Sequence, residues 1–324
     1  MTIRSVISAT GSYLPEKIMS NADLERIVDT SDEWIVQRSG IRNRHISNDT
    51  ETAGYMATKA AQKALEMAGM DASDIDGIIV ATTTADRTFP SVAVQVQHAI
   101  GAPVGVAFDV QAVCSGFVYA LSVADSMMKT GMLKRVLVIG AERMSSILNW
   151  EDRTTCVLFG DGAGAVVLEA QEGKGDKTDR GIHGSVLKAN GKYQDILYTD
   201  GGVSTTKASG HIVMQGKEVF KRAVGYLSEV VEDVLAVCDL EQPDIDWLIP
   251  HQANIRIIES AAKKLGVSMD RVVVTLENHG NTSAASIPLA LDDANRSGKI
   301  QKGEVLLFEA LGGGITWGAI LLRF

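Results

Sequence analysis

Three side chains of complementary chemistry follow separate apolar runs in this 324-residue chain. Cys114 follows "VAFDVQAV", His251 follows "WLIP" and Asn281 follows "VVVTLENHG". Ligands of α/β proteins bind beyond the carboxyl ends of the strands, so we expect these three side chains to face one cleft. A cysteine can form a thioester, a histidine can exchange a proton, and an asparagine amide can donate a hydrogen bond. The set predicts acyl transfer with stabilisation of a thioester oxygen as it becomes negative.

Each of these residues also has a purely structural interpretation. A lone cysteine before an apolar helix is more often a packing residue, and a lone histidine is more often structural. The coincidence of three unlike residues at strand ends favours the chemical interpretation for Cys114, and the helix dipole is expected to lower the pKa of its thiol. Cys156 and Cys238 follow no such strand and are interpreted as packing residues. His279 is close enough in the chain to Asn281 to support it.

Three glycine-rich stretches are candidates for ligand-binding loops. In "GDGAGAVVLEA" (160–170) the glycines precede a strand, which does not fit a dinucleotide-binding loop. The stretch "DGGVSTTKASG" (200–210) is predicted to be an exposed loop. The stretch "EALGGGITWG" (309–318) follows a strand, and its glycines would allow either a tight turn or the close approach of backbone amides to a ligand.

The elements that must position these residues form a repeat with a spacing of about 170 residues. Residues 74–86 resemble residues 244–256, and residues 106–142 resemble residues 272–314. Each longer segment reads as a strand, a small-residue turn, a long helix ending at a glycine, and another strand. The repeat therefore predicts that the cysteine and the asparagine occupy equivalent turns of two halves that face each other.

The chain is predicted to be an α/β protein with two halves. The stretch "QEGKGDKTDR" (171–180) lacks large apolar side chains and is interpreted as a linker. We expect an N-terminal half at 1–173, which carries the cysteine, and a C-terminal half at 174–324, which carries the histidine and the asparagine. Strands that alternate with helices predict parallel sheets covered on both faces.

Composition excludes several classes of protein. A hydrophobic fraction of 45% and a charged fraction of 22% are typical of a globular chain. The net charge of −9 argues against a general nucleic-acid binder and requires a local basic patch for any acidic partner. The three cysteines fit neither a disulfide framework nor a metal motif. Neither a signal peptide nor a membrane-spanning run is recognised, so a cytoplasmic protein without membrane insertion is expected.

The motifs "VCSGF", "PHQANIR" and "NHGNTSAAS" closely resemble those of β-ketoacyl-acyl-carrier-protein synthase III, the initiating condensing enzymes of type II fatty-acid synthesis. The resemblance extends from "GSYLPE" and "SDEWIVQRSGIRNRH" to the final "EALGGGITWGAILLRF". It implies a thiolase-like, five-layered αβαβα fold of two duplicated halves, assembled as a homodimer.

The resemblance also implies a reaction in two halves. Cys114 would take the acyl group of a short acyl-CoA, with acetyl-CoA expected, and release CoA. Malonyl-acyl-carrier protein would then lose carbon dioxide, with His251 and Asn281 stabilising the enolate that attacks the thioester. The product would be a 3-oxoacyl-carrier protein. The amides of Cys114 and Gly313 would bind the thioester oxygen, and no metal or redox cofactor is implied.

Binding residues carry over where the motifs match. The residues that would bind CoA are Trp34, Arg38, Arg153, Gly216, Phe220 and Asn254. Phe89 would reach into the acyl pocket of the partner subunit. Leu311, in the acyl pocket, stands where members selective for short primers often carry phenylalanine, and Lys217 stands where asparagine is common. These departures leave the length and branching of the primer open.

The acyl-carrier protein is acidic, and a basic patch can be proposed for it. In "NIRIIESAAKKLG", Arg256 and Lys263 share a helix face with Lys264 beside them. A second cluster consists of Lys217, Lys221 and Arg222. A merely solvated helix face is the alternative interpretation.

Three other functions remain open. The order Cys, His, Asn also occurs in papain-like hydrolases, but no "CGSCW"-like signature surrounds the cysteine and a papain fold has no duplicated halves. A related condensing enzyme could take a long-chain or aromatic acyl-CoA. An inert scaffold is disfavoured by the retention of all three polar residues.

Overall fold

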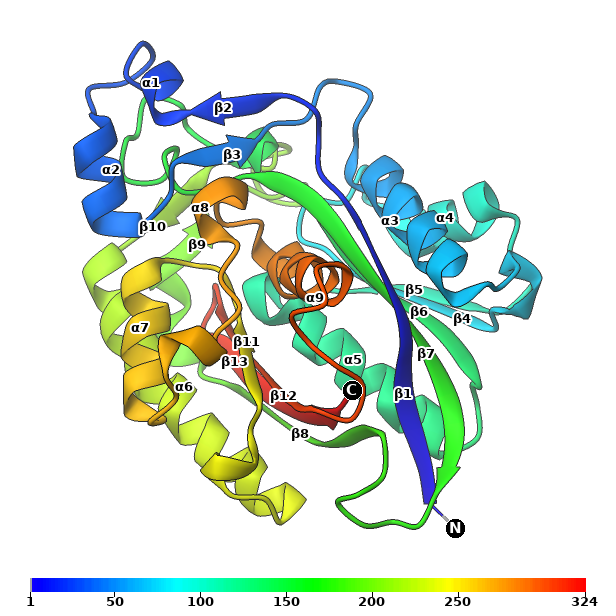
Figure 1. The fold of residues 1–324 in the computed structure, drawn as a ribbon. Helices are drawn as coiled ribbons and strands as arrows, with labels where there is room; N and C mark the ends of the chain where they lie inside the picture. The colour runs from blue at the N-terminus through cyan, green and yellow to red at the C-terminus, as the bar shows by residue number, and fades with distance from the viewer. Residues whose placement is uncertain (1) are drawn as a thin grey trace.

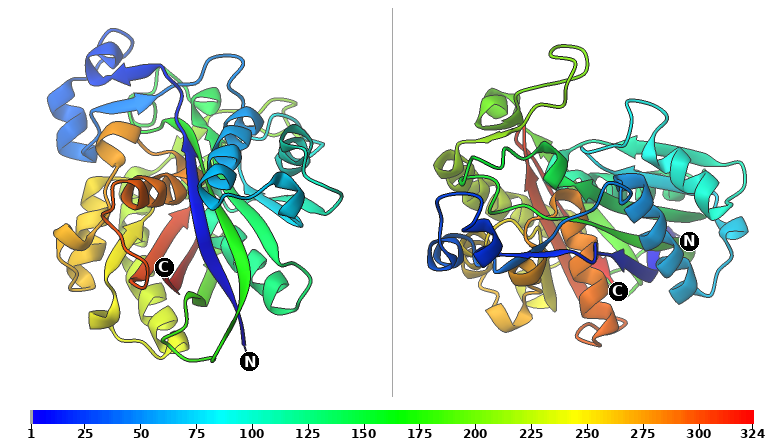
Figure 2. Two further views of the ribbon diagram at one scale, coloured as in Figure 1. Left: turned by 45° about the vertical axis from the view of Figure 1, so that its right-hand side comes forward. Right: turned by 90° about the horizontal axis from the view of Figure 1, so that it is seen from above.

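The computed structural model describes residues 2–324 as five layers, helices and sheets in alternation (Figures 1 and 2). The first sheet has the strand order β1-β7-β6-β4-β5 and the second has the order β11-β12-β13-β8. The strands of the first sheet are β1 (Thr2–Tyr13), β4 (Gly77–Ala81), β5 (Val106–Val110), β6 (Arg135–Arg143) and β7 (Asp161–Gly173). Those of the second are β8 (Gly181–Ala189), β11 (Trp247–Pro250), β12 (Val305–Gly312) and β13 (Thr316–Arg323). Two small antiparallel sheets pair β2 (Ile18–Ser20) with β3 (Asn43–His45) and β9 (Leu197–Thr199) with β10 (Ile212–Met214).

Three helical layers enclose the two sheets. The helices α3 (Ala53–Ala68) and α4 (Val92–Ile100) cover the outer face of the first sheet, and α6 (Gly216–Cys238) and α7 (Ile255–Lys264) cover that of the second. Between the sheets lie α5 (Gly116–Lys129) and α9 (Ser286–Arg296), which form the central core. The short α-helices are α1 (Asn21–Leu24), α2 (Asp32–Ser39) and α8 (Leu276–His279). The 3₁₀ turns are η1 (Ala72–Asp74), η2 (Val113–Ser115), η3 (Met144–Ile147), η4 (Gly191–Ile196), η5 (Gln242–Asp244), η6 (Met269–Arg271) and η7 (Ser283–Ala285).

The predicted duplication of the two halves is confirmed by the strand order and pairing directions. In the first half β4 is parallel to β6, which is antiparallel to β7, which is antiparallel to β1. In the second half β11 is parallel to β12, which is antiparallel to β13, which is antiparallel to β8. Each half thus supplies one sheet and one of the two central helices.

The expectation of parallel sheets is wrong, because both sheets are mixed. A parallel pair needs a long crossover between its strands, whereas antiparallel neighbours can be joined by a turn. The strands β12 and β13 are joined by the glycine turn that follows Gly312, with Gly312 paired to Thr316. The helix–strand alternation of the sequence therefore predicts correctly only the parallel pairs, which are β4 with β5, β4 with β6 and β11 with β12.

The strand predicted before Asn281 is also largely absent. Only an isolated parallel bridge joins Val272 to Leu248, and the chain then turns into α8. The Gln252 side chain replaces the missing ladder, because its Oε1 accepts the N–H groups of Thr275 at 2.9 Å and Leu276 at 3.2 Å. The second sheet consequently has one strand fewer than the first.

The connection between the halves is shorter than predicted and is anchored. The strand β7 runs to Gly173, so that residues 174–180 alone connect it to β8. Asp179 accepts hydrogen bonds from the Lys174 and Gly175 amides and pairs with Arg4 of β1 at 3.3 Å. The backbone hydrogen bond from Lys174 is the largest of the contacts that lower the pKa of Asp179, to about 2.

The substitution Leu121→Ala tests the role of the central helix α5, where Leu121 is fully buried. Leaving a cavity between the two sheets should lower the free energy of unfolding by about 2–5 kcal/mol. The measurement is urea denaturation at a fixed protein concentration. Met132→Ala is the control, since Met132 is 64% exposed and its truncation should change the free energy by less than about 0.5 kcal/mol. A change that small for Leu121→Ala would contradict the packing described.

Candidate active site

The two predicted turns face each other at the centre of the molecule. Cys114 lies in η2 between β5 and α5, and Asn281 lies between α8 and η7. Val113 and Ser283 are equivalent in the two turns, and both have a left-handed φ of 49°. Strained backbone of this kind is concentrated at functional sites. The equivalence of Val113 and Ser283 makes Ala284, rather than Asn281, the residue that corresponds to Cys114.

The two turns approach each other closely because glycines line their contact. A Cβ atom on Gly140 of β6 would lie 2.3 Å from the carbonyl oxygen of Ala284. A Cβ atom on Gly116, at the start of α5, would lie 3.4 Å from the Cβ of Ala284. Any larger residue at Gly140 would therefore push the turn that carries Asn281 away from the first sheet.

The turn that carries Cys114 is held by strands of the C-terminal half. The Thr316 and Ser115 hydroxyls donate to the Ala112 carbonyl at 3.0 and 2.8 Å. A Cβ atom on Gly312 would lie 2.8 Å from the Cys114 amide nitrogen. The glycine stretch that includes Gly313 thus adjoins the backbone of the cysteine, which is the arrangement that two converging amides require.

The turn that carries Asn281 is held by the segment before β7. The Asn281 N–H donates to Leu158 O at 2.8 Å, and the Gly160 N–H donates to Asn281 O at 3.0 Å. The Ser283 N–H donates to Asn281 Oδ1 at 2.8 Å. Because its oxygen is engaged, the Asn281 amide presents its N–H groups to the cavity.

His251 is fixed at the end of β11 as a neutral hydrogen-bond donor. Its Nδ1 lies 2.7 Å from Ser286 Oγ, which also accepts the Gln252 N–H at 3.2 Å. With the Ser286 hydroxyl assigned as the donor to Nδ1, the single proton of the neutral imidazole lies on Nε2. Burial lowers the pKa of His251 to about 3, so the ring is uncharged at neutral pH.

The pKa of the Cys114 thiol differs from the value expected from the sequence. Only 5% of the residue is exposed, and burial raises the pKa of its thiol to about 12. The helix α5 begins only at Gly116, and its dipole does not offset the loss of water around the sulfur. The prediction of a lowered pKa is wrong, and the thiol must lose its proton as it reacts.

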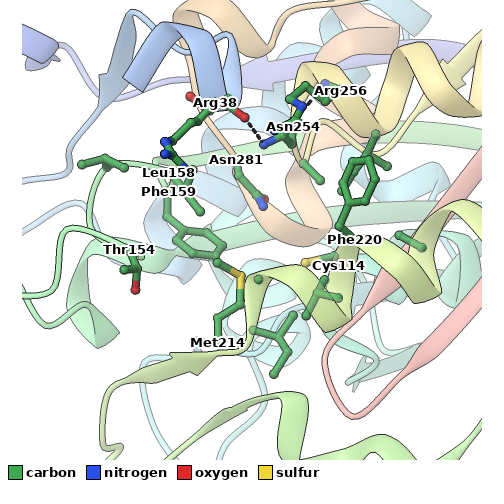
Figure 3. Close-up of a pocket in the computed structure, with 18 of the residues that line it drawn as sticks. Arg38, Cys114, Thr154, Leu158, Phe159, Met214, Phe220, Asn254, Arg256 and Asn281 are labelled. Atoms are coloured by element: carbon green, nitrogen blue, oxygen red, sulfur yellow. Dashed lines mark hydrogen bonds between the residues drawn. The ribbon is translucent and has the colours of Figure 1, made fainter. Parts of the chain in front are cut away.

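A cavity of about 720 Å³ contains all three residues (Figure 3). This volume lies in the range of small-molecule sites. The predicted residues that line it are Trp34, Arg38, Cys114, Gly216, Lys217, Phe220, His251, Asn254, Arg256, Asn281 and Leu311. Figure 3 shows Cys114 and Asn281 pointing toward the same space, with Phe220 on one wall and Phe159 on the other.

The mouth of the cavity carries an aromatic ring flanked by two guanidinium groups. The Cζ atoms of Arg38 and Arg153 lie 4.7 and 5.3 Å from the centroid of Trp34. The Asn254 amide donates to Arg38 O at 2.7 Å and connects α2 to α7. A flat ring beside guanidinium groups is suited to a nucleotide base and its phosphates.

Other predicted residues lie outside the cavity wall. Arg153 and Gly313 adjoin it, whereas Phe89 is 82% exposed on the surface. Lys221, Lys263 and Lys264 are exposed on α6 and α7. Arg222 is a weaker member of the basic set, because it lies 4.3 Å from the Tyr193 ring centroid and pairs with Glu218 at 3.7 Å. His279 does not line the cavity; burial lowers its pKa to about 4.

Most of the remaining lining, which is largely apolar, was not identified from the sequence. It includes Thr154, Val157, Leu158, Phe159, Leu197, Met214, Val219, Ala223, Leu227 and Ile257. On α6 the signal was present, since Gly216, Phe220, Ala223 and Leu227 recur at helical spacing. Phe159 and Met214 lie in irregular or short segments that carry no such period.

Comparison with known proteins supports the acyl-transfer chemistry inferred from the candidate site. Residues 108–191 match the family model described as 3-oxoacyl-(acyl-carrier-protein) synthase III, and residues 235–324 match the model of its C-terminal part. The chain is 58% identical to the beta-ketoacyl-acyl-carrier-protein synthase III of Paramagnetospirillum magneticum over 100% of both chains. The chain belongs to the β-ketoacyl-acyl-carrier-protein synthase III family. Members of this family are the acyltransferases that initiate type II fatty-acid synthesis, and the chain is one of these condensing enzymes.

Solved structures of similar proteins support the same family membership. The 3-oxoacyl-(acyl-carrier-protein) synthase III of Aquifex aeolicus superimposes with a TM-score of 0.93, at 47% identity over 99% of this chain and 100% of that one. The priming beta-ketosynthase of the R1128 polyketide pathway has the same TM-score at 35% identity, over 99% of this chain and 96% of that one. The thiolase-like fold predicted from the sequence is confirmed.

The substitution Ser286→Ala tests how His251 is held. Without the hydroxyl at Nδ1, the ring is free to carry its proton on either nitrogen, so the condensation rate should fall by about tenfold or more, a part of the contribution expected of a positioned proton donor. Because acylation of Cys114 precedes this step, kcat/KM for acyl-CoA should not change. Carbon dioxide release measures the effect, and a full rate in the variant would refute the assigned tautomer.

Proposed function

We propose that the chain transfers the acyl group of a short acyl-CoA, with acetyl-CoA as the expected primer, to Cys114 and condenses it with malonyl-acyl-carrier protein. The products are CoA, carbon dioxide and a 3-oxoacyl-carrier protein. The observation that carries the proposal is the convergence of Cys114, His251 and Asn281 in one cavity whose mouth holds Trp34 and its arginines. The family membership gives the reaction class.

In the first half of the reaction, Cys114 Sγ attacks the thioester carbonyl and the CoA sulfur leaves. The amides of Cys114 and Gly313 hold the carbonyl oxygen as it becomes negative. The close packing of Gly312 on the Cys114 amide supports this role, because it brings the glycine stretch beside the reacting sulfur.

In the second half, the malonyl group loses carbon dioxide and leaves an enolate. A neutral His251 Nε2–H and the Asn281 amide donate hydrogen bonds to the enolate oxygen, and both are fixed before the substrate arrives. The enolate carbon attacks the acyl carbonyl, the bond to Cys114 Sγ breaks, and the 3-oxoacyl product leaves on the carrier protein.

The CoA moiety is proposed to lie along the cavity from Trp34 to the cysteine. The adenine would stack on Trp34, and Arg38 with Arg153 would bind phosphates. Arg153 pairs with Asp29 in the free structure at 3.4 Å, so it would exchange this contact for a phosphate. Gly216, Phe220 and Asn254 would contact the pantetheine chain, since all of them line the cavity.

A homodimer is proposed because the first half exposes large apolar side chains and an unpaired strand edge. Phe89 is 82% exposed and Val104 is fully exposed, while β5 is a half-buried edge strand of the first sheet. An unpaired edge with apolar side chains is a surface that a second copy can cover. Phe89 of each subunit would then close the acyl pocket of the other, opposite Leu311.

The carrier protein is proposed to dock on the basic faces of α6 and α7. Arg256 lines the cavity, and Lys221, Lys263 and Lys264 are exposed on the same two helices. Arg222 would contribute only after leaving Glu218. Opposite charges on the acidic carrier protein would steer its approach.

Two further points complete the proposal. No metal or redox cofactor is needed by the proposed steps. The enzyme is proposed to act in the cytoplasm; within residues 2–324, none of the helices has the length and apolarity to span a bilayer. The second candidate function is condensation of a larger primer, which the replacement of phenylalanine by Leu311 favours.

Intact-protein mass spectrometry tests the proposed function. Incubation with acetyl-CoA and a panel of longer, branched and aromatic acyl-CoAs should give one acyl adduct, which malonyl-acyl-carrier protein discharges with release of carbon dioxide. Cys114→Ala should form no adduct, and Cys238→Ala, at the C-terminal end of α6 and outside the cavity lining, is the control that should retain it. An adduct on another residue, or one that water alone discharges, would overturn the proposal in favour of a hydrolase.

A further inference from the structure

A buried arginine outside the cavity contacts the segment that holds Asn281. Arg44 lies in β3, which runs beside α8, the helix that precedes Asn281 (Figure 1). The residue is fully buried, and its guanidinium stays charged at neutral pH because burial lowers its pKa only to about 10. Its four acceptors are all uncharged oxygens: Met19 O, Asn21 Oδ1, Arg42 O and Val157 O. Since a buried charge needs hydrogen bonds in place of water, the guanidinium fixes the segments that supply these oxygens.

One side of the guanidinium binds the N-terminal arm, which we define as residues 18–45 and which comprises β2, α1, α2 and β3. The Nη1 atom of Arg44 donates to Asn21 Oδ1 at 2.8 Å. The Asn21 amide donates in turn to Asp32 Oδ1 at 2.8 Å, at the first residue of α2, the helix that carries Trp34. The arginine is therefore anchored in the same network that fixes α2 at the mouth of the cavity.

The other side of the guanidinium binds the segment that precedes β7. The Nη2 atom of Arg44 donates to Val157 O at 2.8 Å. The next residue, Leu158, accepts the Asn281 N–H at 2.8 Å, and the Gly160 N–H donates to Asn281 O at 3.0 Å. Both backbone polar groups of Asn281 are thus bound by a segment that Arg44 connects to the N-terminal arm.

Two glycines allow the arginine to pack this closely. A Cβ atom on Gly160 would lie 3.1 Å from the Arg44 Cβ and 2.5 Å from the carbonyl oxygen of His279. A Cβ atom on Gly280 would lie 3.2 Å from the Arg44 Cβ, and Gly280 has a φ of 66° with a ψ of −166°, a conformation that favours glycine. The Arg44 side chain therefore packs against both segments that meet at Asn281.

We propose that Arg44 is a positioning residue for Asn281, which holds residues 157–160 against the N-terminal arm and so keeps the Asn281 amide aimed at the enolate oxygen. The inference rests on the proposed function, because the role of Asn281 in condensation belongs to it. Arg44 does not line the cavity and contacts no reacting atom. The turn of Cys114 is held by Thr316 instead, so Arg44 should serve the second half of the reaction and not the first.

The test measures the two half-reactions separately in the full-length enzyme. Each variant is first acylated with saturating acetyl-CoA, and the acyl-enzyme is quantified by intact-protein mass spectrometry. Malonyl-acyl-carrier protein is then added, and the release of carbon dioxide is followed together with the loss of the adduct. Because the second rate is expressed per acyl-enzyme, a fraction of unfolded protein does not affect it.

The substitution Arg44→Met should lower the discharge rate by about tenfold or more, which is part of the roughly 100-fold loss expected when a preorganised donor is removed. Its acylation rate at saturating acetyl-CoA should change by less than about twofold, since the loss is confined to the second transition state. Arg44→Lys keeps the charge but replaces two donor nitrogens by one, so it should recover part of the loss and still remain about threefold or more below the wild type.

Arg4→Lys is the matched control, because Arg4 is also a buried arginine and pairs with Asp179 in the connection between the halves. It should change neither the acylation rate nor the discharge rate.

A double variant tests whether the arginine acts through the asparagine. Asn281→Ala alone should lower the discharge rate by about 100-fold. Adding Arg44→Lys to Asn281→Ala should lower it by less than about a further twofold, because no amide is left to position. A purely structural effect would lower the rate by the same factor in both backgrounds.

Equal losses in acylation and in discharge would overturn the inference. A wild-type discharge rate in Arg44→Lys, or its full effect persisting in the double variant, would also overturn it. If Arg44→Met does not fold, Arg44→Lys decides the question alone. The proposed function fails separately, if the wild-type enzyme forms no adduct at Cys114 or releases no carbon dioxide when malonyl-acyl-carrier protein is added.

Discussion

The structure depends on the backbone contact between two strand-to-helix turns, one from each half of the duplicated fold. Gly140 of β6 allows the carbonyl of Ala284 to lie against the first sheet, and Gly116 allows the central helices to meet at their amino ends. Each turn is also held by the opposite half: Thr316 binds the turn of Cys114, and Glu142 binds the turn of Asn281 through Ser283. The site is therefore built at an internal interface, and neither half contains it alone.

This arrangement explains how a buried site can be both rigid and reactive. The hydrogen bonds that fix Asn281 and His251 come from backbone and serine groups that do not contact the substrate. The donors are therefore oriented before any substrate binds, which is the condition for stabilising charge that develops only during the reaction. The same burial favours the protonated form of the free thiol.

Much of the fold and of the candidate site could be predicted from the sequence. The features that could not be predicted have one physical reason in common, which is that no local sequence pattern reveals them. The repeat placed Cys114 and Asn281 in facing turns because strand, turn and helix order is a local pattern. The direction in which the pKa of the Cys114 thiol shifts could not be predicted from such a local pattern. The desolvation of this thiol depends on neighbours from both halves. The missing strand before Asn281 depends on one side chain, Gln252, that substitutes for a ladder. Glu142 was not identified at all, since a carboxyl at the end of a strand has no distinctive spacing.

The central claim is that the facing turns form one acyl-transfer site, and a crystal structure of the enzyme soaked with acetyl-CoA tests it most directly. The account predicts continuous density from Cys114 Sγ to an acetyl group whose carbonyl oxygen lies within hydrogen-bond distance of the Cys114 and Gly313 amides. The His251 and Asn281 donors should point at the space beside it. An acetyl group whose oxygen points away from both amides, or an unmodified Cys114 in an enzyme shown to be acylated, would contradict the account.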